Sequence, residues 1–136
     1  MATRLFRHCF TFAITVVAIS VCAFVWLHAL GSEYKTTYLS FNTPVELPGV
    51  GLAPGTYVFE LAKPFDDQRI VRVMSRDRST VYFTGFTQLV HRPPGLRPDV
   101  FVSFGEAAVG NPLPVSVWYP PGDSLGRRFM YRHGNR

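Results

Sequence analysis

The stretch Phe41–Leu61, FNTPVELPGVGLAPGTYVFEL, decides the fold class of this chain. Pro44, Pro48 and Pro54 each fix φ and lack an amide donor, so no helix can run through the stretch. The glycines interspersed with these prolines supply backbone freedom where the chain must reverse. The stretch therefore predicts a short strand, a turn and a longer second strand.

The longer strand shows a regular alternation of side chains. Tyr57, Phe59 and Leu61 fall on one face of an extended chain, while Val58 and Glu60 fall on the other. We expect the face with the two aromatic residues and the leucine to form the first wall of a β core.

The remainder of the chain after residue 31 repeats this pattern of short apolar runs separated by turn residues. Seven or eight strands at intervals of roughly ten residues predict an all-β fold, an antiparallel β-sandwich or a small barrel, in a single domain over residues 32–136. Gly85 interrupts one apolar run, and we expect a bulge or a bend there. The other expected strands cover residues 34–41, 69–75, 80–83, 86–90, 100–104, 115–119 and 127–131.

Residues 1–31 do not resemble the rest of the chain. The run Phe10–Leu27 is apolar with three polar interruptions, and Arg4 and Arg7 precede it. A helix over this run rises about 27 Å, close to the ~30 Å hydrocarbon core of a bilayer. Basic residues on its amino side favour that end staying in the cytoplasm. The segment is therefore predicted to be a signal peptide or a signal-anchor helix.

The two outcomes for this segment give two locations for the domain. Small residues before a cleavage between Gly31 and Ser32 favour a signal peptide, which would release the domain as a secreted or periplasmic protein. The length of the apolar run and Trp26 favour an anchor, with residues 10–27 in the membrane and the carboxy-terminal domain outside. Both outcomes are extracytoplasmic. Because Cys9 and Cys22 lie in this segment, the domain has no disulfide and no cysteine chemistry.

Basic residues gather at the carboxy-terminal end. The chain has 14 Lys and Arg against 9 Asp and Glu, and the last stretch contains Arg127, Arg128 and Arg132. One hypothesis is that these three arginines contact an anionic surface such as lipid headgroups. The alternative is an ordinary solvated strand and tail.

The search for catalytic chemistry assigns no catalytic residue, no metal ligand and no cofactor. His91 lies beside a proline-rich loop, His133 lies in the tail, and Ser124, although it stands in a G-x-S-x-G match over residues 122–126, lies in an expected turn. The acidic residues of the turns do not form a calcium-binding loop pattern. Nucleic acid is not an expected partner of an exported domain.

Binding is the more plausible role. Trp118 and Tyr119, beside the P-P-G-D turn, are candidates to present aromatic faces to a ligand together with His91. The alternative is that Trp118 belongs to the core and Tyr119 covers it.

Four blocks of sequence follow one another within residues 36–131: PVELPG, LAPGTYVF, RIVRV and WYPPGDSLG, the last followed by RFMY. Their combination resembles a family of short exported bacterial β-domain proteins of unassigned function. The resemblance implies export and an all-β domain, and it transfers no functional residue.

These observations predict an exported, non-enzymatic β-domain that binds a ligand or partner at the cell envelope. Its partner would be an envelope polymer, a lipid headgroup or a protein. The alternative function is a metal-dependent or hydrolytic extracytoplasmic enzyme.

Overall fold

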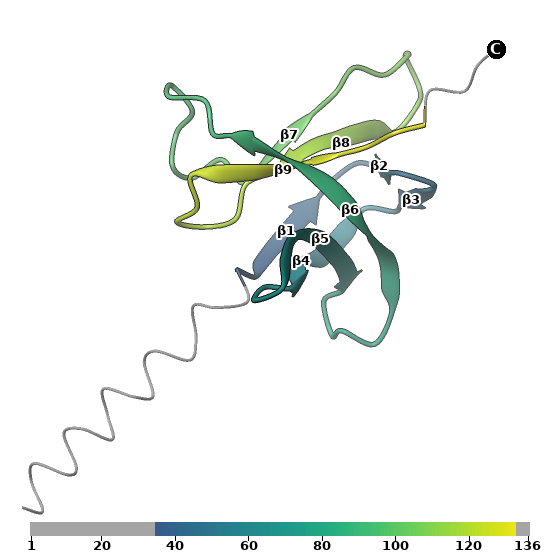
Figure 1. Ribbon diagram of the computed structural model, residues 1–136. Helices are drawn as coiled ribbons and strands as arrows, with labels where there is room; N and C mark the ends of the chain where they lie inside the picture. The colour runs from purple at the N-terminus through teal and green to yellow at the C-terminus, as the bar shows by residue number, and fades with distance from the viewer. Residues whose placement is uncertain (1–34, 133–136) are drawn as a thin grey trace, which may run out of the picture. The chain divides into compact units, whose positions relative to one another are not determined.

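The computed structural model describes residues 35–132 of the chain, and the predicted leader over residues 1–31 lies outside this range. The described part is all-β, as predicted, and contains nine strands (Figure 1). No helix among these residues has the length and apolar character needed to cross a membrane. The strands are β1 (Thr37–Phe41), β2 (Val45–Leu47), β3 (Val50–Leu52), β4 (Gly55–Lys63), β5 (Asp67–Ser75), β6 (Val81–His91), β7 (Val102–Phe104), β8 (Leu113–Trp118) and β9 (Leu125–Phe129).

All nine strands belong to one open sheet. Its order is β1-β4-β5-β6-β9-β8-β2-β3, with β7 paired to β8. The sheet folds over along β6, whose first half pairs with β5 and whose second half pairs with β9. Figure 1 shows β6 passing from the layer of β1, β4 and β5 to the layer of β7, β8 and β9.

The core fills the space between these two layers. Phe59 of β4 is fully buried, and its ring centroid lies 6.1 Å from that of Trp118 on β8 and 6.4 Å from that of Phe129 on β9. Tyr57 and Leu61 are buried in the same cluster. The prediction for the core face of β4 is therefore confirmed.

The opposite face of β4 is buried as well. Val58 is 0% exposed and Glu60 is 2% exposed, although both point away from the core cluster. Met74 of β5, the cross-strand neighbour of Val58, is also buried. Side chains of the outer face must therefore cover β4, and charged residues take part in this cover.

The stretch that decides the fold class contains one more strand than expected. Leu47 and Val50 face each other across a two-residue turn, so β2 and β3 form a hairpin. Pro48 holds its φ fixed, and Gly49 takes a φ of +78°, which a residue with a side chain rarely adopts. Both strands have only three residues, which is too short for an alternation to be visible in sequence.

One pairing departs from the antiparallel prediction. β2 runs parallel to β8, with Val45 opposite Leu113, whereas β9 pairs antiparallel with Val117 and Trp118 at the other end of β8, so β8 forms a fork between the two strands. Tyr131 follows β9 at this fork. Its hydroxyl group lies 2.8 Å from the carbonyl oxygens of both Glu46 and Val115, so its single proton is shared between the two strands. Burial raises the pKa of Tyr131 far above its usual value, with a further increase from Glu46.

Of the bulge or bend expected at Gly85, the bulge is not there. Gly85 pairs regularly with Val71, and the register between β5 and β6 shifts instead at Tyr82. The glycine serves packing, because a Cβ at this position would lie 2.6 Å from the Phe83 ring. The expected bulge was therefore wrong in position.

Candidate functional site

Trp118 and Tyr119 do not present their rings to solvent. Trp118 is 0% exposed, packs on Phe59 and donates a hydrogen bond of 3.1 Å from its indole nitrogen to the Thr37 hydroxyl. Tyr119 is 5% exposed, and the Arg92 guanidinium carbon lies 5.1 Å from its ring centroid. A ligand arriving from solvent therefore finds neither ring open for stacking, and Trp118 is the core residue that the alternative describes.

His91 is exposed at the last position of β6, opposite Leu125 of β9. The loop that follows is held by Arg92, whose guanidinium donates to the carbonyl oxygens of Arg97 and Val100 at 2.5 and 2.9 Å. His91 and the two aromatic residues with which it was grouped therefore do not share an exposed surface: His91 is exposed, whereas Trp118 and Tyr119 are buried.

Arg127 is the largest correction to the predicted basic surface. Its side chain is 0% exposed, so it cannot contact a lipid headgroup or any other external anion. The reason is its place on β9: Arg127 shares the inward face with Phe129, while Arg128 between them points outward and is exposed. Arg132 is also exposed, three residues beyond the end of the strand.

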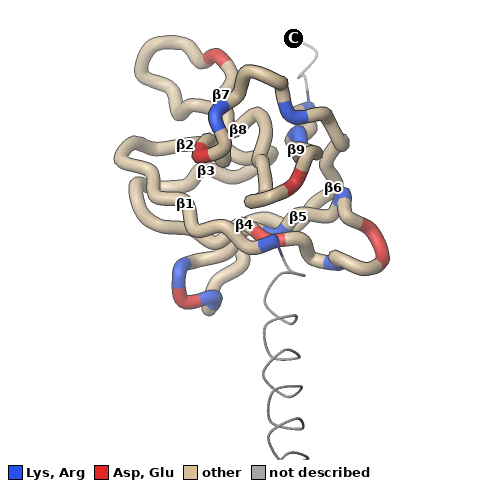
Figure 2. The backbone as a smooth tube through the Cα atoms, turned by 90° about the vertical axis from the view of Figure 1, so that its left-hand side faces the viewer, with Lys and Arg blue, Asp and Glu red and all other residues tan. Residues whose placement is uncertain are grey.

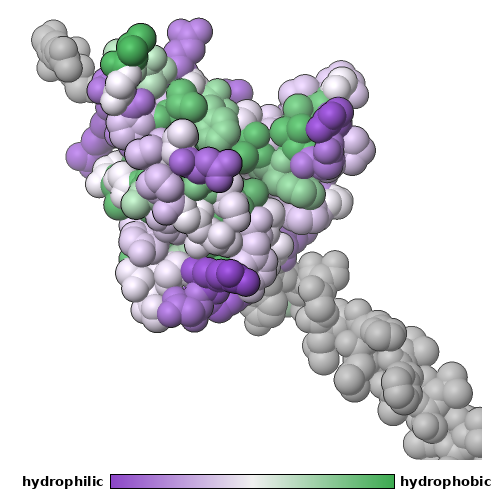
Figure 3. All heavy atoms as spheres, turned by 180° about the vertical axis from the view of Figure 1, so that it is seen from behind, coloured by the Kyte–Doolittle hydropathy of each residue, from purple (hydrophilic) through white to green (hydrophobic). Residues whose placement is uncertain are grey.

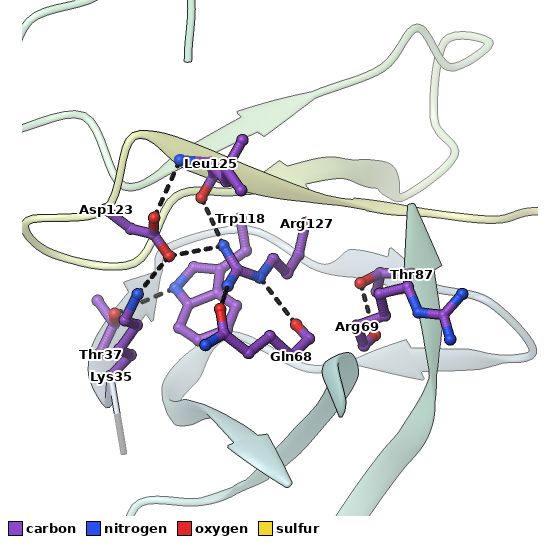
Figure 4. A network of polar contacts seen from close by, with 9 residues as sticks. All are labelled: Lys35, Thr37, Gln68, Arg69, Thr87, Trp118, Asp123, Leu125 and Arg127. Atoms are coloured by element: carbon purple, nitrogen blue, oxygen red, sulfur yellow. Dashed lines mark hydrogen bonds and ion pairs between the residues drawn. The ribbon is translucent and has the colours of Figure 1, made fainter. Parts of the chain in front are cut away.

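The buried guanidinium of Arg127 makes four hydrogen bonds (Figure 4). Its Nε donates to the Gln68 carbonyl oxygen at 3.0 Å, and its Nη1 donates to the Leu125 carbonyl oxygen at 2.6 Å. The same Nη1 forms an ion pair of 2.8 Å with Asp123 Oδ2. The fourth bond, from Nη2 to Gln68 Oε1, is 3.3 Å long. A buried charge is tolerated when it is paired and hydrogen-bonded in this way.

Asp123 links this arginine to Lys35, two residues before β1. Its Oδ2 also accepts from Lys35 Nζ at 2.7 Å, and its Oδ1 accepts from the Leu125 amide at 3.1 Å. Burial by itself raises the pKa of Asp123, but the hydrogen bonds from Lys35, Leu125 and Arg127 outweigh burial and hold the pKa below its usual value of 3.8. We name Lys35, Gln68, Asp123 and Arg127 the Asp123 cluster.

The Asp123 cluster gives a structural meaning to the block W-Y-P-P-G-D-S-L-G. Gly122 takes a φ of +71° in the turn before Asp123. A Cβ on Gly126 would lie 2.6 Å from Val117 Cγ1 and 2.7 Å from the Tyr119 ring, so only glycine fits there. The block therefore builds the β8–β9 connection and positions Asp123 against Arg127.

A second ion cluster covers the outer face of β4. The Arg72 guanidinium donates to Glu60 Oε1 from Nε at 3.1 Å and from Nη2 at 2.6 Å, and Arg78 Nη1 donates to Oε2 at 2.6 Å. Here the carboxylate is buried, whereas the side chains of Arg72 and Arg78 are 39% and 46% exposed. We name these three residues the Glu60 cluster. Figure 2 shows that most other charged positions lie in turns and at strand ends.

Exposed apolar side chains lie next to arginines along β6 and at the residue that follows β9. Phe86 and Met130 are 56% and 53% exposed, and together with Leu89 and Arg69 they line a shallow groove of about 550 Å³. The Arg69 guanidinium carbon lies 5.9 Å from the Phe86 ring centroid. We name this region the β6–β9 face. Apolar surface is unevenly distributed elsewhere too, since the view from behind shows apolar patches in its upper half and a mainly hydrophilic lower end (Figure 3).

Arg128 and Arg132 border this face. Both are exposed, and neither has an ion-pair partner among residues 35–132. Arg128 lies opposite Gln88 across the β6–β9 ladder, and Arg132 lines an adjoining hollow with Met130. Two of the three arginines predicted for an anionic surface are thus accessible beside an apolar groove.

The described residues bring together no group of three or more His, Cys, Asp and Glu side chains suited to hold a metal ion. No protein-family model, no curated protein and no solved structure matches this chain. The resemblance to exported bacterial β-domain proteins therefore stays a prediction from the four sequence blocks.

Proposed function

We propose that this protein is an exported, non-enzymatic β-domain that binds at the cell envelope, and that its β6–β9 face docks on an anionic lipid surface. The observation that carries this proposal is the exposure of Phe86 and Met130 beside Arg128 and Arg132. The two-layered sheet, a small sandwich rather than a closed barrel, acts as the scaffold for this face.

The physical argument combines two weak attractions. Each arginine near an anionic membrane contributes on the order of 1 kcal/mol, and this contribution decreases as salt shortens the Debye length. The apolar side chains gain by leaving water, at roughly 25 cal/mol per Å² of apolar surface buried. Two acidic residues lie near this region: Glu46 lines the hollow shared by Met130 and Arg132, and Asp67 pairs with Arg69 of the groove.

Other acidic groups are already committed to partners inside the domain. Asp123, Glu60 and Asp67 each accept hydrogen bonds from one or more basic side chains. These three carboxylates are therefore not free to act as a general acid or base, which must be able to reach a substrate.

Vesicle binding tests the proposal. The fragment 32–136, first checked for cooperative unfolding, is sedimented with anionic and with neutral vesicles at about 0.1 M and about 1 M salt, where the Debye length is about 10 and 3 Å. We expect binding to anionic vesicles at low salt only. Arg128→Gln with Arg132→Gln should abolish most of it, and so should Phe86→Ser with Met130→Ser.

The matched control is Lys63→Gln with Arg97→Gln. Both residues are exposed, Lys63 at the end of β4 and Arg97 in the loop after β6, and are paired locally with Asp66 and Asp99, so this variant loses the same net charge at other positions. Docking through the β6–β9 face would be contradicted if the Arg128/Arg132 and Lys63/Arg97 double variants lost vesicle binding equally. Equal binding of the wild type to neutral and anionic vesicles would contradict it too.

A further inference from the structure

A second surface lies on the outer face of β1 and β4, next to the turn after β5. Tyr38, Ser40, Thr56 and Arg76 line a shallow depression of about 520 Å³ there. Ser40 and Thr56 face each other across the β1–β4 ladder, and their hydroxyl oxygens lie 2.8 Å apart. Tyr38 is 58% exposed, and Arg76 is exposed on the turn.

We propose that this depression binds an acidic sugar, a uronate unit of a polysaccharide, with its carboxylate on Arg76 and its ring against Tyr38. This site is separate from the β6–β9 face and does not depend on the membrane proposal.

The first step of the argument concerns hydrogen-bond donors. Ser40 and Thr56 use one hydroxyl hydrogen on each other, which leaves a second O–H group and several lone pairs facing solvent. Arg76 has no hydrogen-bond or ion-pair partner among the other residues of the range 35–132, so its planar fork of N–H groups is available. A planar carboxylate matches that fork, and sugar hydroxyls match the serine and threonine.

The second step concerns charge. The carboxylate of the neighbouring Asp77 accepts from the hydroxyls of Ser75 and Ser79 at 2.6 and 2.8 Å, which lower its pKa to about 2. Glu60 is enclosed by its two arginines. Asp77 stays ionised beside Arg76, but its carboxylate is hydrogen-bonded to the two serines and not to the arginine. Around the depression the three cations Arg72, Arg76 and Arg78 outnumber the two carboxylates of Glu60 and Asp77, and this excess of positive charge favours an anion.

The third step concerns shape. Tyr38 alternates with Ser40 on the outward face of β1, so its exposed ring stands next to the hydroxyl pair. The C–H face of a pyranose ring is apolar and packs on such a ring, while its hydroxyl groups reach the polar edge. A simple anion has no use for the tyrosine, whereas an acidic sugar uses every group that lines the depression.

Calorimetric titration of the full chain, kept in a polyoxyethylene detergent that carries no sugar headgroup, tests the site. Three probes of equal length are compared: trigalacturonate, its methyl ester and a triglutamate peptide. We expect trigalacturonate to bind, and the ester and the peptide to bind at least about tenfold more weakly, since each lacks either the charge or the ring. No heat from trigalacturonate, or equal affinity for triglutamate, would overturn the proposal.

Variants locate the binding. Arg76→Gln should weaken the binding of trigalacturonate about tenfold, and Arg76→Lys should weaken it less, because lysine keeps the charge but lacks the planar fork. Tyr38→Leu should weaken it about fivefold. Arg97→Gln, an exposed arginine paired with Asp99, should change it less than about twofold. All three side chains are at the surface, so unchanged thermal unfolding is expected. Equal effects of Arg76→Gln and Arg97→Gln would refute the site.

Discussion

The Asp123 cluster and the Glu60 cluster bury opposite charges. In the Asp123 cluster the enclosed group is the Arg127 guanidinium, which is 0% exposed, and the carboxylate is its main charged partner. In the Glu60 cluster the enclosed group is a carboxylate, and its arginine partners remain 39% and 46% exposed. The difference decides what remains when the carboxylate is replaced by a neutral residue. In the Asp123 cluster a buried cation remains, whereas in the Glu60 cluster the remaining cations reach water.

The largest effect is expected from Asp123→Asn. The substitution leaves Arg127 buried without its counter-charge, and breaking a buried pair in this way costs about 3–5 kcal/mol. Urea unfolding of the variant should show this loss in the free energy of unfolding. Adding Arg127→Met should recover part of it, because neither charge is then buried. A loss below about 1 kcal/mol for Asp123→Asn would mean that the carbonyl oxygens of Gln68 and Leu125 suffice for the guanidinium.

Glu60→Gln should cost less, about 1–2 kcal/mol, because the arginines that it releases can be hydrated. The buried amide keeps an acceptor for one of them. The same urea experiment gives the comparison directly. A loss as large as that of Asp123→Asn would show that the cover of Val58 depends on the ion cluster.

Arg78→Gln should have a smaller effect, about 0.2–1 kcal/mol, because this half-exposed arginine forms an ion pair screened by solvent. Arg72 still donates two hydrogen bonds to Glu60 Oε1 in the variant. Adding Arg72→Gln should cost more than the sum of the two single changes, since only the double variant leaves the carboxylate buried and unpaired. Additive losses would argue against this shared role.

The smallest effect concerns pH. Because the folded protein lowers the pKa of Asp123 below 3.8, this group adds stability above pH 3.8, and that stability is lost as the pH falls through the folded pKa. The difference in unfolding free energy between wild type and Asp123→Asn should therefore shrink below about pH 3.8. Unfolding curves from pH 7 to pH 2.5 measure it. A difference that stays constant over this range would show that Asp123 does not gain stability through its charge.

The strands with clear alternation were predictable from the sequence. Tyr57, Phe59 and Leu61 form the core face of β4, as expected. The hairpin of β2 and β3 was not resolved, because three-residue strands give no period. The parallel pairing of β2 with β8 was also out of reach, since it depends on the placement of residues far apart in sequence.

The inward position of Arg127 had a readable signal. Leu125, Arg127 and Phe129 alternate on β9, and two apolar residues on either side of an arginine indicate the core face. Asp123, four residues earlier, supplies the counter-charge that such a position needs. The contributions of Gln68 and Lys35 had no such signal, because only the folded sheet brings them to Arg127 and Asp123.

The fork at β8 also constrains how the chain folds. The Tyr131 hydroxyl reaches the Glu46 carbonyl oxygen across 85 positions of sequence, and β2 finds its parallel partner only in β8. Contacts with such separation give a high contact order, and domains dominated by them fold on a scale of milliseconds to seconds. The β2–β3 hairpin can therefore pair with β8 only after β8 has been synthesised. A nascent domain that stops before residue 131 also lacks the hydrogen bond from Tyr131 to the Glu46 carbonyl oxygen.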